Sequence, residues 1–468
     1  MGASGVAALN SSLLMSAEQT RASPQTIVYQ INPRATWSDG TPITYQDFEY
    51  NWEAQSGKKQ FTDVGGKAFD PVDEPGYDDI ASVSGTAANP FTVTVRFSKP
   101  YPDWRSLFSY LVPAHIAKSV GFNSGFTDPV ADLVSGGPFL VSELQDGYSL
   151  QLVRNARYWG APANLSSVTY YFTSGPAEML DAISAGQLDV ASLQVPASDF
   201  QQLQATSGIS VQPVASALYE DLDFNEAAGP FTSKVLREAV MMSVDRNGMA
   251  SSFLGGFGLS AKPLENRVLL PGAPGYFPDG DTFDQPAPST ALQVLAAAGY
   301  NEVGGRLRGP DGAPVVVTLS VDPDDFVAAQ LADGIVAACV GIGMKVKLVD
   351  SVPAPPASGG WEMALERRQV PEWPSSIVKR YVTGGAANID GYSSAAMDAL
   401  VALVPTTAAS ELPALYDRID AQAWKDFVDL PLVQLPVVFA VKRGLLNLEP
   451  GPYYADLSGD EQEWGFAS

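Results

Sequence analysis

Alternating apolar and polar residues predict β-strands in many parts of the chain. The clearest run is Phe91-Thr92-Val93-Thr94-Val95-Arg96-Phe97, where every second side chain is apolar, as expected for a strand with one buried face. Shorter runs of the same kind, or continuous apolar runs, predict further strands over residues 25–31, 148–153, 168–173, 189–191, 209–214, 219–224, 315–321, 344–350 and 432–441.

Apolar residues at helical spacing predict helices between these strands. The longest predicted helix covers Ser233–Phe253, with Leu236, Val240 and Val244 on one side. Similar patterns predict helices over residues 176–185, 289–299, 325–340, 394–404 and 411–427. The strand, helix and strand over residues 315–350 form a βαβ-type unit, in which Cys339 is expected as a buried core thiol.

A strand-turn-helix corner is predicted over Ala35–Ala54. Asp39-Gly40 is typical of a tight turn, because glycine tolerates a positive φ and aspartate hydrogen-bonds its own backbone. Thr44 is expected to cap a helix whose first turn contains Asp47.

The chain is long enough for more than one domain. A length of 468 residues exceeds what one hydrophobic core supports, and two or three domains are expected. The residue composition changes over residues 255–288, where Gly, Pro and Asp dominate and periodicity is weak. This indicates a linker or a segment that crosses between domains. Mixed strands and helices predict an α/β fold.

Charge and composition exclude several function classes. The formal net charge of −24 disfavours nucleic acid as a partner and gives no attraction to anionic lipid. No apolar run is long enough to span a membrane, and the first 23 residues lack the basic and apolar regions of a signal peptide. One cysteine allows no internal disulfide, and one histidine removes most metal and general-base chemistry.

The motifs of common enzymes are missing, and the candidates that remain are weak. His115 lies in an apolar stretch and is interpreted as structural. Asp279–Asp284 resembles a calcium loop but lacks the bidentate glutamate that such a loop needs, so a solvated loop is favoured. The aromatic residues Tyr101, Trp104, Phe108 and Tyr110 are expected to pack in a core. Neither a metal nor a cofactor is expected.

One stretch combines aromatic and charged side chains in the way that a small-molecule pocket does. Residues 361–374 contain Trp361, Arg367, Arg368, Glu372 and Trp373, which are the candidate ligand-binding residues. The alternative is a strand followed by a surface loop with incidental salt bridges.

Seven motifs in order resemble those of the family 5 extracellular solute-binding proteins, which include the peptide-, nickel- and oligosaccharide-binding subunits of ABC importers. These motifs are W-S-D-G-T-P-I-T-Y-Q-D-F from Trp37, L-V-P-A-H-I from Leu111, G-G-P-F from Gly136, N-A-R-Y-W-G from Asn155, A-G-Q-L-D-V-A from Ala185, the run from Asp223 to Arg246, and L-A-A-A-G-Y from Leu295. The resemblance runs from about Gln25 to the C-terminus.

This resemblance implies a two-lobed fold of the large peptide-binding class, with the ligand between the lobes. The first lobe would be discontinuous, comprising residues 1–262 and 433–468, and the second lobe would comprise residues 263–432. The implied function is binding and not catalysis, in a monomer outside the cytoplasm. A signal and a lipid anchor on the outer face of the membrane would precede the sequence given.

A departure from the family pattern leaves the ligand open. Peptide-binding members share a "D-y-P-D-P" stretch whose first acid meets the peptide amine, and here the corresponding run is Glu372-Trp373-Pro374-Ser375-Ser376. Within the family the chain is similar to mycobacterial lipoproteins, which implies a phosphatidylinositol-mannoside-type glycolipid ligand and an influence on lipomannan and lipoarabinomannan synthesis.

The candidate residues would have different roles with different ligands. For a glycolipid, Trp361 and Trp373 would stack on sugar faces, Arg367 and Arg368 would meet phosphate or hydroxyl groups, and Glu372 would accept from hydroxyls. The alternatives are an oligopeptide-binding subunit of an ABC importer, in which Glu372 meets the peptide amine, and a regulatory module that no longer transports. The protein partner would be an ABC permease or an envelope mannosyltransferase.

Overall fold

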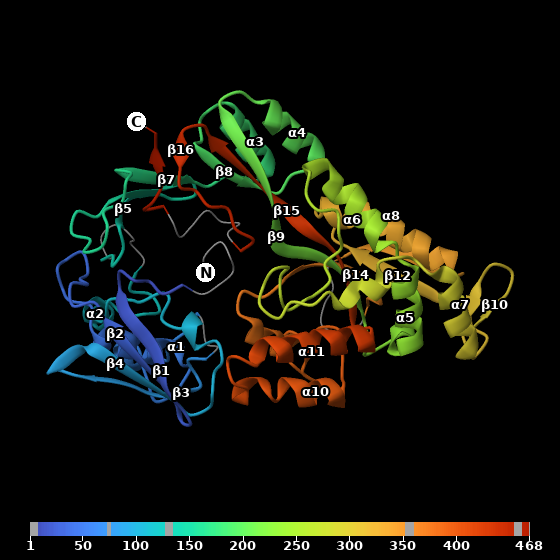
Figure 1. The fold of residues 1–468 in the computed structure, drawn as a ribbon, viewed down its shortest axis with the longest axis horizontal. Helices are drawn as coiled ribbons and strands as arrows, with labels where there is room; N and C mark the ends of the chain where they lie inside the picture. The colour runs from blue at the N-terminus through green and yellow to red at the C-terminus, as the bar shows by residue number, and fades with distance from the viewer. Residues whose placement is uncertain (1–7, 73–75, 127–133, 352–359, 454–460, 468) are drawn as a thin grey trace.

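The computed structural model describes residues 8–72, 76–126, 134–351, 360–453 and 461–467. Figure 1 shows two antiparallel sheets on one side of the molecule and a larger mixed sheet with its helices on the other. In the described part of the chain, no helix combines the length and the apolar character needed to cross a membrane.

The N-terminal third of the chain contains the two antiparallel sheets. The first has the order β1-β2-β4-β3, and the second has the order β5-β6-β7. The strands are β1 (Leu14–Ala22), β2 (Gln25–Ile31), β3 (Ile80–Thr86), β4 (Asn89–Phe97), β5 (Phe139–Gln145), β6 (Ser149–Arg154) and β7 (Ser167–Tyr171). The helices of this region are α1 (Tyr45–Gln55), η1 (Val64–Gly66), η2 (Trp104–Ser106) and α2 (Ala114–Val120).

The central sheet has six strands in the order β13-β12-β14-β9-β15-β8. Its strands are β8 (Val190–Leu193), β9 (Ile209–Phe224), β12 (Val316–Val321), β13 (Lys345–Asp350), β14 (Met363–Gln369) and β15 (Asp429–Lys442). β12 is parallel to β13 and β14, whereas β14, β9, β15 and β8 are mutually antiparallel neighbours. Two short pairs complete the strands, β10 (Asn301–Glu302) with β11 (Leu307–Arg308) and β16 (Leu445–Leu446) with β17 (Gly465–Phe466).

Helices cover the central sheet. The α-helices are α3 (Pro176–Ser184), α4 (Ala197–Ala205), α5 (Lys234–Ser243), α6 (Arg246–Leu254), α7 (Pro288–Ala297), α8 (Phe326–Gly341), α9 (Val378–Tyr381), α10 (Ala395–Val401) and α11 (Leu412–Asp426). The 3-10 helices are η3 (Pro230–Thr232), η4 (Gly255–Phe257), η5 (Asp279–Phe283), η7 (Pro374–Ile377) and η8 (Val404–Thr406). The largest apolar core lies between the sheet and α5–α8, and α9–α11 enclose a separate one.

Two long strands connect these regions. β9 and β15 run across the middle of the molecule in Figure 1, with β8, α3 and α4 at one end and β14 and β12 at the other. The sequence pattern predicts two strands over residues 209–224, but β9 is continuous, so this prediction is wrong. The polar residues in its middle, including Ser216, are tolerated because the Ser216 hydroxyl donates to the Leu435 carbonyl at 2.8 Å.

The long helix predicted over Ser233–Phe253 is also wrong, because two helices occupy this range. α5 ends at Ser243, Val244 adopts an extended conformation, and Asp245 caps α6 by accepting from the Gly248 backbone N–H at 2.9 Å. The apolar spacing continues through the break, since Val244 still points into the core. The pattern therefore does not reveal where the backbone bends.

The corner predicted at the start of the chain is confirmed. Thr44 caps α1 in a capping box, and the carboxylate of Asp47 accepts from the Thr44 N–H at 2.8 Å. The same carboxylate accepts from the Ala114 N–H at 3.0 Å and from the Trp37 indole at 3.2 Å, so it joins three segments. Asp47 is buried, and its role is structural.

The core predictions for single residues have mixed outcomes. Cys339 is fully buried, as predicted, and Trp104 and Phe108 are buried in the core of the first sheet. Tyr110 is 90% exposed, so its predicted core position is wrong. Its backbone carbonyl accepts from the Asn51 side chain at 2.7 Å.

The apolar cores agree in outline with a chain that forms separate lobes. One core is built from residues between Ile27 and Trp159, and the largest core from residues between Leu222 and Leu435. The lobe boundaries near residues 262 and 433 stay a prediction.

Candidate functional site

The candidate segment 361–373 extends along the whole of β14. Trp361 precedes the strand, Arg367 and Arg368 lie near its end, and Glu372 and Trp373 lie in the loop that follows. The structure therefore places the five candidate residues in three different environments and does not gather them around one pocket.

Trp361 is part of the protein interior. Its side chain is 4% exposed, and its carbonyl accepts from the Asn225 side chain at 3.0 Å. The residue adjoins the point where β14 begins to pair with β9, at Met363 and Phe224. In this structure the ring offers no surface for the sugar stacking proposed from the sequence.

Arg367 and Arg368 point to opposite faces of the sheet, because successive side chains of a strand alternate. Arg367 lies within 3.3 Å of Glu220 and 2.5 Å of Asp325, and it donates to the Gln194 side chain at 3.1 Å. These three groups come from β9, the start of α8 and the loop after β8. The guanidinium thus joins different parts of the chain and lies against two acidic side chains.

Arg368 belongs to a buried network of charges on the other face, which we call the ion network. Its members are Asp221, Asp223, Arg267, Arg368, Arg380, Asp390, Asp420 and Asp429. At its centre the Nη2 atom of Arg380 lies 2.5 Å from Asp429 and 2.8 Å from Asp223. Arg368 pairs with Asp223 and lies 3.8 Å from Asp390.

The ion network has five carboxylates and three guanidinium groups, so its formal charge is negative when every group is ionised. Burial raises the pKa of Asp221 well above its usual range and the pKa of Asp390 to about 7. Burial also tends to raise the pKa of Asp429, but the positive charges of Arg267 and Arg380 have the larger effect and lower it. Protons on the first two acids would balance the charge of the network.

Three of these acids are close enough to hold a cation. Carboxylate oxygens of Asp221, Asp223 and Asp429 lie within 4.8 Å of one another. The Arg380 guanidinium already lies among them and supplies the positive charge. The sequence analysis missed this network, although Asp221 and Asp223, at alternate positions near the end of β9, were a detectable signal.

Glu372 and Trp373 lie where several parts of the chain meet, in a loop over residues 370–375 that we call the junction loop. Before Glu372, the Val370 N–H donates to the Ala217 carbonyl at 2.9 Å, and the Pro371 carbonyl accepts from the Tyr453 hydroxyl at 3.4 Å. After Trp373, the Ser375 N–H donates to Asp103 at 2.9 Å.

The junction loop brings Glu372 into the electrostatic surroundings of Tyr453. Burial raises the pKa of Tyr453 to about 12, and the charge of Glu372 acts in the same direction. Glu372 and Trp373 are both half-buried. The loop thus presents an acid and an aromatic ring between elements that are remote in sequence.

A cavity of about 390 Å³ adjoins this loop. It is lined on one side by residues from the region of the first sheet and on the other by residues from η7 to η8, namely Gly76, Asp78, Asp79, Pro100, Tyr101, Pro102, Ser375, Val378, Lys379, Val404 and Pro405. Two carboxylates and one ammonium group give the lining an acidic character. The cavity is therefore better suited to a cationic group than to an anion.

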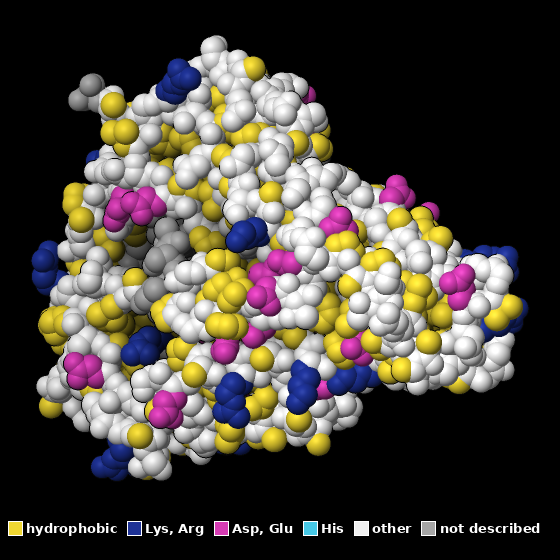
Figure 2. Space-filling model, turned by 45° about the vertical axis from the view of Figure 1, so that its right-hand side comes forward, with side chains coloured by type: hydrophobic (Ala, Val, Ile, Leu, Met, Phe, Trp, Pro, Cys, Tyr) yellow, Lys and Arg dark blue, Asp and Glu magenta, His cyan; other side chains and the backbone are white. Residues whose placement is uncertain are grey.

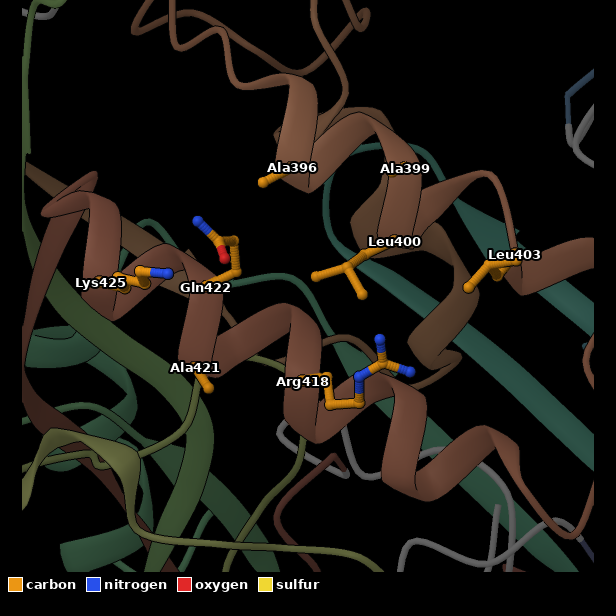
Figure 3. A pocket seen from close by; sticks show the side chains of 8 residues that line it. All are labelled: Ala396, Ala399, Leu400, Leu403, Arg418, Ala421, Gln422 and Lys425. Carbon is orange, nitrogen blue, oxygen red and sulfur yellow. The ribbon is translucent and has the colours of Figure 1, made fainter.

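Other hollows lie away from the junction loop. Figure 3 shows a groove between α10 and α11, with Leu400 and Arg418 on its two sides. Most of its lining is alanine and leucine, and it contains none of the candidate residues. On the face drawn in Figure 2, acidic and basic side chains are scattered among apolar ones and form no extended basic patch.

His115 is more polar in its surroundings than the sequence suggests. Its Nε2 atom lies 2.7 Å from Asp39, and its side chain is 30% exposed. The pair connects α2 to the turn before Thr41, whose N–H donates to Asp39 at 2.8 Å. This contact agrees with a structural role for His115, but the surroundings of its ring are polar and not apolar.

The comparisons with known proteins agree with this geometry. The family model of the bacterial extracellular solute-binding proteins, family 5 Middle, matches residues 10–384. The oligopeptide-binding protein OppA of Mycobacterium tuberculosis is 30% identical over 469 residues, covering 96% of this chain and 75% of the relative. The probable monoacyl phosphatidylinositol tetramannoside-binding protein LpqW of the same species is 30% identical over 304 residues, covering 62% of this chain and 44% of the relative.

Solved structures give the same fold. The periplasmic EDTA-binding protein EppA matches with a TM-score of 0.87 at 26% identity, covering 98% of this chain and 88% of that protein. The oligopeptide-binding protein AppA of Bacillus subtilis, solved with a nonapeptide, matches with a TM-score of 0.74 at 19% identity, covering 97% and 90% of the two chains. The predicted two-lobed α/β fold is confirmed, and the chain belongs to the bacterial extracellular solute-binding proteins of family 5, which are binding proteins and not enzymes.

Proposed function

We propose that this protein binds oligopeptides between its lobes and delivers them to an ABC permease. The junction loop would contact the ligand, with Glu372 pairing with the protonated amine of the peptide and Trp373 packing beside it. The protein would act as a monomer outside the cytoplasm, attached to the membrane by a lipid anchor that precedes the sequence given. The relative OppA, which aligns with 96% of the chain, supports this proposal.

The observation that carries the proposal is the distribution of charge at the candidate site. Arg367 and Arg368 are already paired with carboxylates, so neither is available to a phosphate group without breaking an ion pair. Glu372 instead lies in the junction loop, whose Ser375 lines a cavity that also contains Asp78 and Asp79. A ligand with a positive charge fits this arrangement, because a half-buried carboxylate favours an opposite charge nearby.

Calorimetry on a Glu372→Gln variant tests the proposal. Loss of a charged hydrogen bond should weaken the binding of a free peptide by about 1.5–3 kcal/mol, or about 10- to 150-fold. Glu411→Gln, which neutralises an exposed acid of the second lobe, should leave the affinity unchanged. Acetylation of the peptide amine should weaken binding to the wild type but cause no further loss in Glu372→Gln. Equal losses from acetylation in both proteins would contradict the pairing.

A second candidate ligand is a phosphatidylinositol-mannoside-type glycolipid, with an influence on lipomannan and lipoarabinomannan synthesis. It is supported by the similarity to LpqW over 62% of the chain and by the half-buried Trp373, which follows Glu372 in a loop whose Pro371 carbonyl accepts from the Tyr453 hydroxyl. An envelope mannosyltransferase would then be the partner. Calorimetric titration with purified mannosides and with mixed oligopeptides separates the two: heat from mannosides alone would favour the glycolipid and refute the peptide proposal.

A further inference from the structure

Asp103 lies in a loop that is fixed firmly to the first sheet. The side chain of the buried residue Gln25, on β2, accepts from the Tyr101 N–H at 2.7 Å and donates to the Tyr101 carbonyl at 3.0 Å. Trp104, directly after Asp103, is buried in the core of that sheet. The position of Asp103 is therefore determined on both sides by its own part of the molecule.

Ser375 is fixed equally firmly to the opposite part. It lies in η7, which continues directly into α9, and α9 carries Arg380. The guanidinium of Arg380 is held by the ion network, which includes Asp223 on β9 and Asp429 on β15. Ser375 is therefore connected to the central sheet through α9 and Arg380.

A hydrogen bond from the backbone of Ser375 joins this residue to Asp103. The Asp103 carboxylate accepts from the Ser375 N–H at 2.9 Å across a sequence separation of 272 residues. Trp373, at the start of η7, contributes no side-chain hydrogen bond to the helix terminus, so Asp103 supplies an acceptor that the local sequence does not. Asp103 is 8% exposed, and burial raises its pKa while the bonds from Ser375 oppose that change.

We infer that Asp103 is a positioning residue, which holds the junction loop in its ligand-binding position and stabilises the lobes in contact through Ser375. This inference rests on the proposed function, since it assigns the loop that carries Glu372 to the ligand. Separation of the lobes replaces a hydrogen bond to a charged group with bonds to water. A ligand that binds only when the lobes are in contact loses affinity in proportion to the population of that state.

The test compares Asp103→Ala and Asp103→Asn with a matched control, Asp78→Asn. Asp78 lines the same cavity and loses the same charge, but within the described residues its carboxylate makes no hydrogen bond or ion pair to the second lobe. Asp103→Ala should weaken the binding of an oligopeptide mixture about 10-fold or more, which is the value of a charged hydrogen bond. Asparagine keeps an acceptor oxygen, so Asp103→Asn should recover a large part of the loss, and the control should stay within about twofold of the wild type.

The distance between the lobes gives a readout that a purely structural role would not change. Spin labels on Ala88→Cys and Ala402→Cys, both exposed, report this distance, and the buried Cys339 is not expected to be labelled. Asp103→Ala should shift the distances measured without peptide toward longer values, and added peptide should restore the short ones. Circular dichroism checks that each variant is folded. If Asp103→Ala does not fold, the affinity and the distances of Asp103→Asn test the inference instead.

The outcomes separate the inference from the proposed function. If the wild type binds no peptide but Asp103→Ala still lengthens the distances, the function fails and the contact between the lobes stands. If peptide binds the wild type and the Asp103 variants equally well with unchanged distances, the inference is overturned and the proposed function stands.

Discussion

Removal of the central arginine of the ion network should destabilise the protein severely. The side chain of Arg380 is 8% exposed, and its Nη2 atom lies within 3.4 Å of four carboxylates. Burial alone would lower the pKa of Arg380, but these acids raise it well above its ordinary value. An Arg380→Met variant keeps much of the side-chain volume and removes the positive charge, so it isolates the electrostatic part of the interaction.

The expected loss follows from the burial of the partners. Breaking a buried ion pair by removal of one member costs about 3–5 kcal/mol, because the other charge stays buried without compensation. A domain is stable by only about 5–15 kcal/mol in total, so this loss is a large fraction. Protonation of the remaining acids limits it: Asp390, with a pKa of about 7, takes up a proton readily below neutral pH. The loss should therefore be smaller at pH 5 than at pH 8.

Urea unfolding monitored by circular dichroism measures this effect at both values of pH. Lys379→Met, at the neighbouring exposed position of α9, is the matched control and should change the free energy of unfolding by less than about 0.5 kcal/mol. The double variant Arg380→Met/Asp390→Asn should recover part of the loss, because one uncompensated charge is removed. A loss below about 1 kcal/mol for Arg380→Met, or an equal loss at both values of pH, would refute the reasoning.

Three further predictions concern stability and reactivity. Burial raises the pKa of Glu220 and of Glu226 to about 8. The stability that their protonated forms contribute is therefore complete below about pH 4 and is lost as the pH rises through 8. Asp429 has a lowered pKa and acts in the opposite direction, because its contribution is lost as the pH falls below about 4. Thermal unfolding at pH 5, 7 and 9 should show the highest midpoint at pH 5, and a higher midpoint at pH 9 would contradict this. Thr44→Ala should reduce the free energy of urea unfolding by about 1 kcal/mol, the usual value of a helix cap, and Thr44→Ser should restore it. Burial raises the pKa of Cys339 to about 12, so a thiol reagent should react with it in urea but not in the native protein, and rapid native labelling would show that the site opens.

The features that the sequence predicts well are local ones. The strand at Phe91–Phe97 is predicted within two residues of β4, because alternation reports directly on a face that is buried. The cap at Thr44 is predicted because its partner, Asp47, is only three residues away. The burial of Cys339 follows from its place on the apolar side of α8. Each of these predictions needs only neighbours within one element.

The ion network could not be predicted in the same way, because strand pairing assembles it. β14 pairs with β9 so that Arg368 lies opposite Tyr219 and Glu366 lies opposite Asp221. β15 then places Asp429 opposite Asp223 from the other side. The spacing of residues in the sequence does not specify this strand register. Arg368 is therefore interpreted from the sequence as a cation available to a ligand, although it is paired inside the protein.

The five candidate residues illustrate the same limit within one short segment. Trp361 and Trp373 lie in the same short segment, but Trp361 is 4% exposed and Trp373 is half-buried. The difference is set by β14, which starts in the interior and ends where the parts of the chain meet. Composition singled out this stretch of chain but could not say which of its ends is accessible.

The position of the ion network has a consequence for how the lobes can move. Ser216 and Gln434 mark an irregular step in the pairing of β9 and β15, where side chains replace ladder hydrogen bonds: the Gln434 side chain donates to the Ser216 carbonyl at 3.0 Å. Farther along, at Asp223 and Asp429, the two strands are held to α9 by Arg380, and α9 follows η7 at the end of the junction loop. Hinge motion concentrates where few contacts resist a change of backbone angle, so we expect bending at the step and not within the network. The junction loop would then move with the second lobe as one body, and its contact with Asp103 would form or break as a whole.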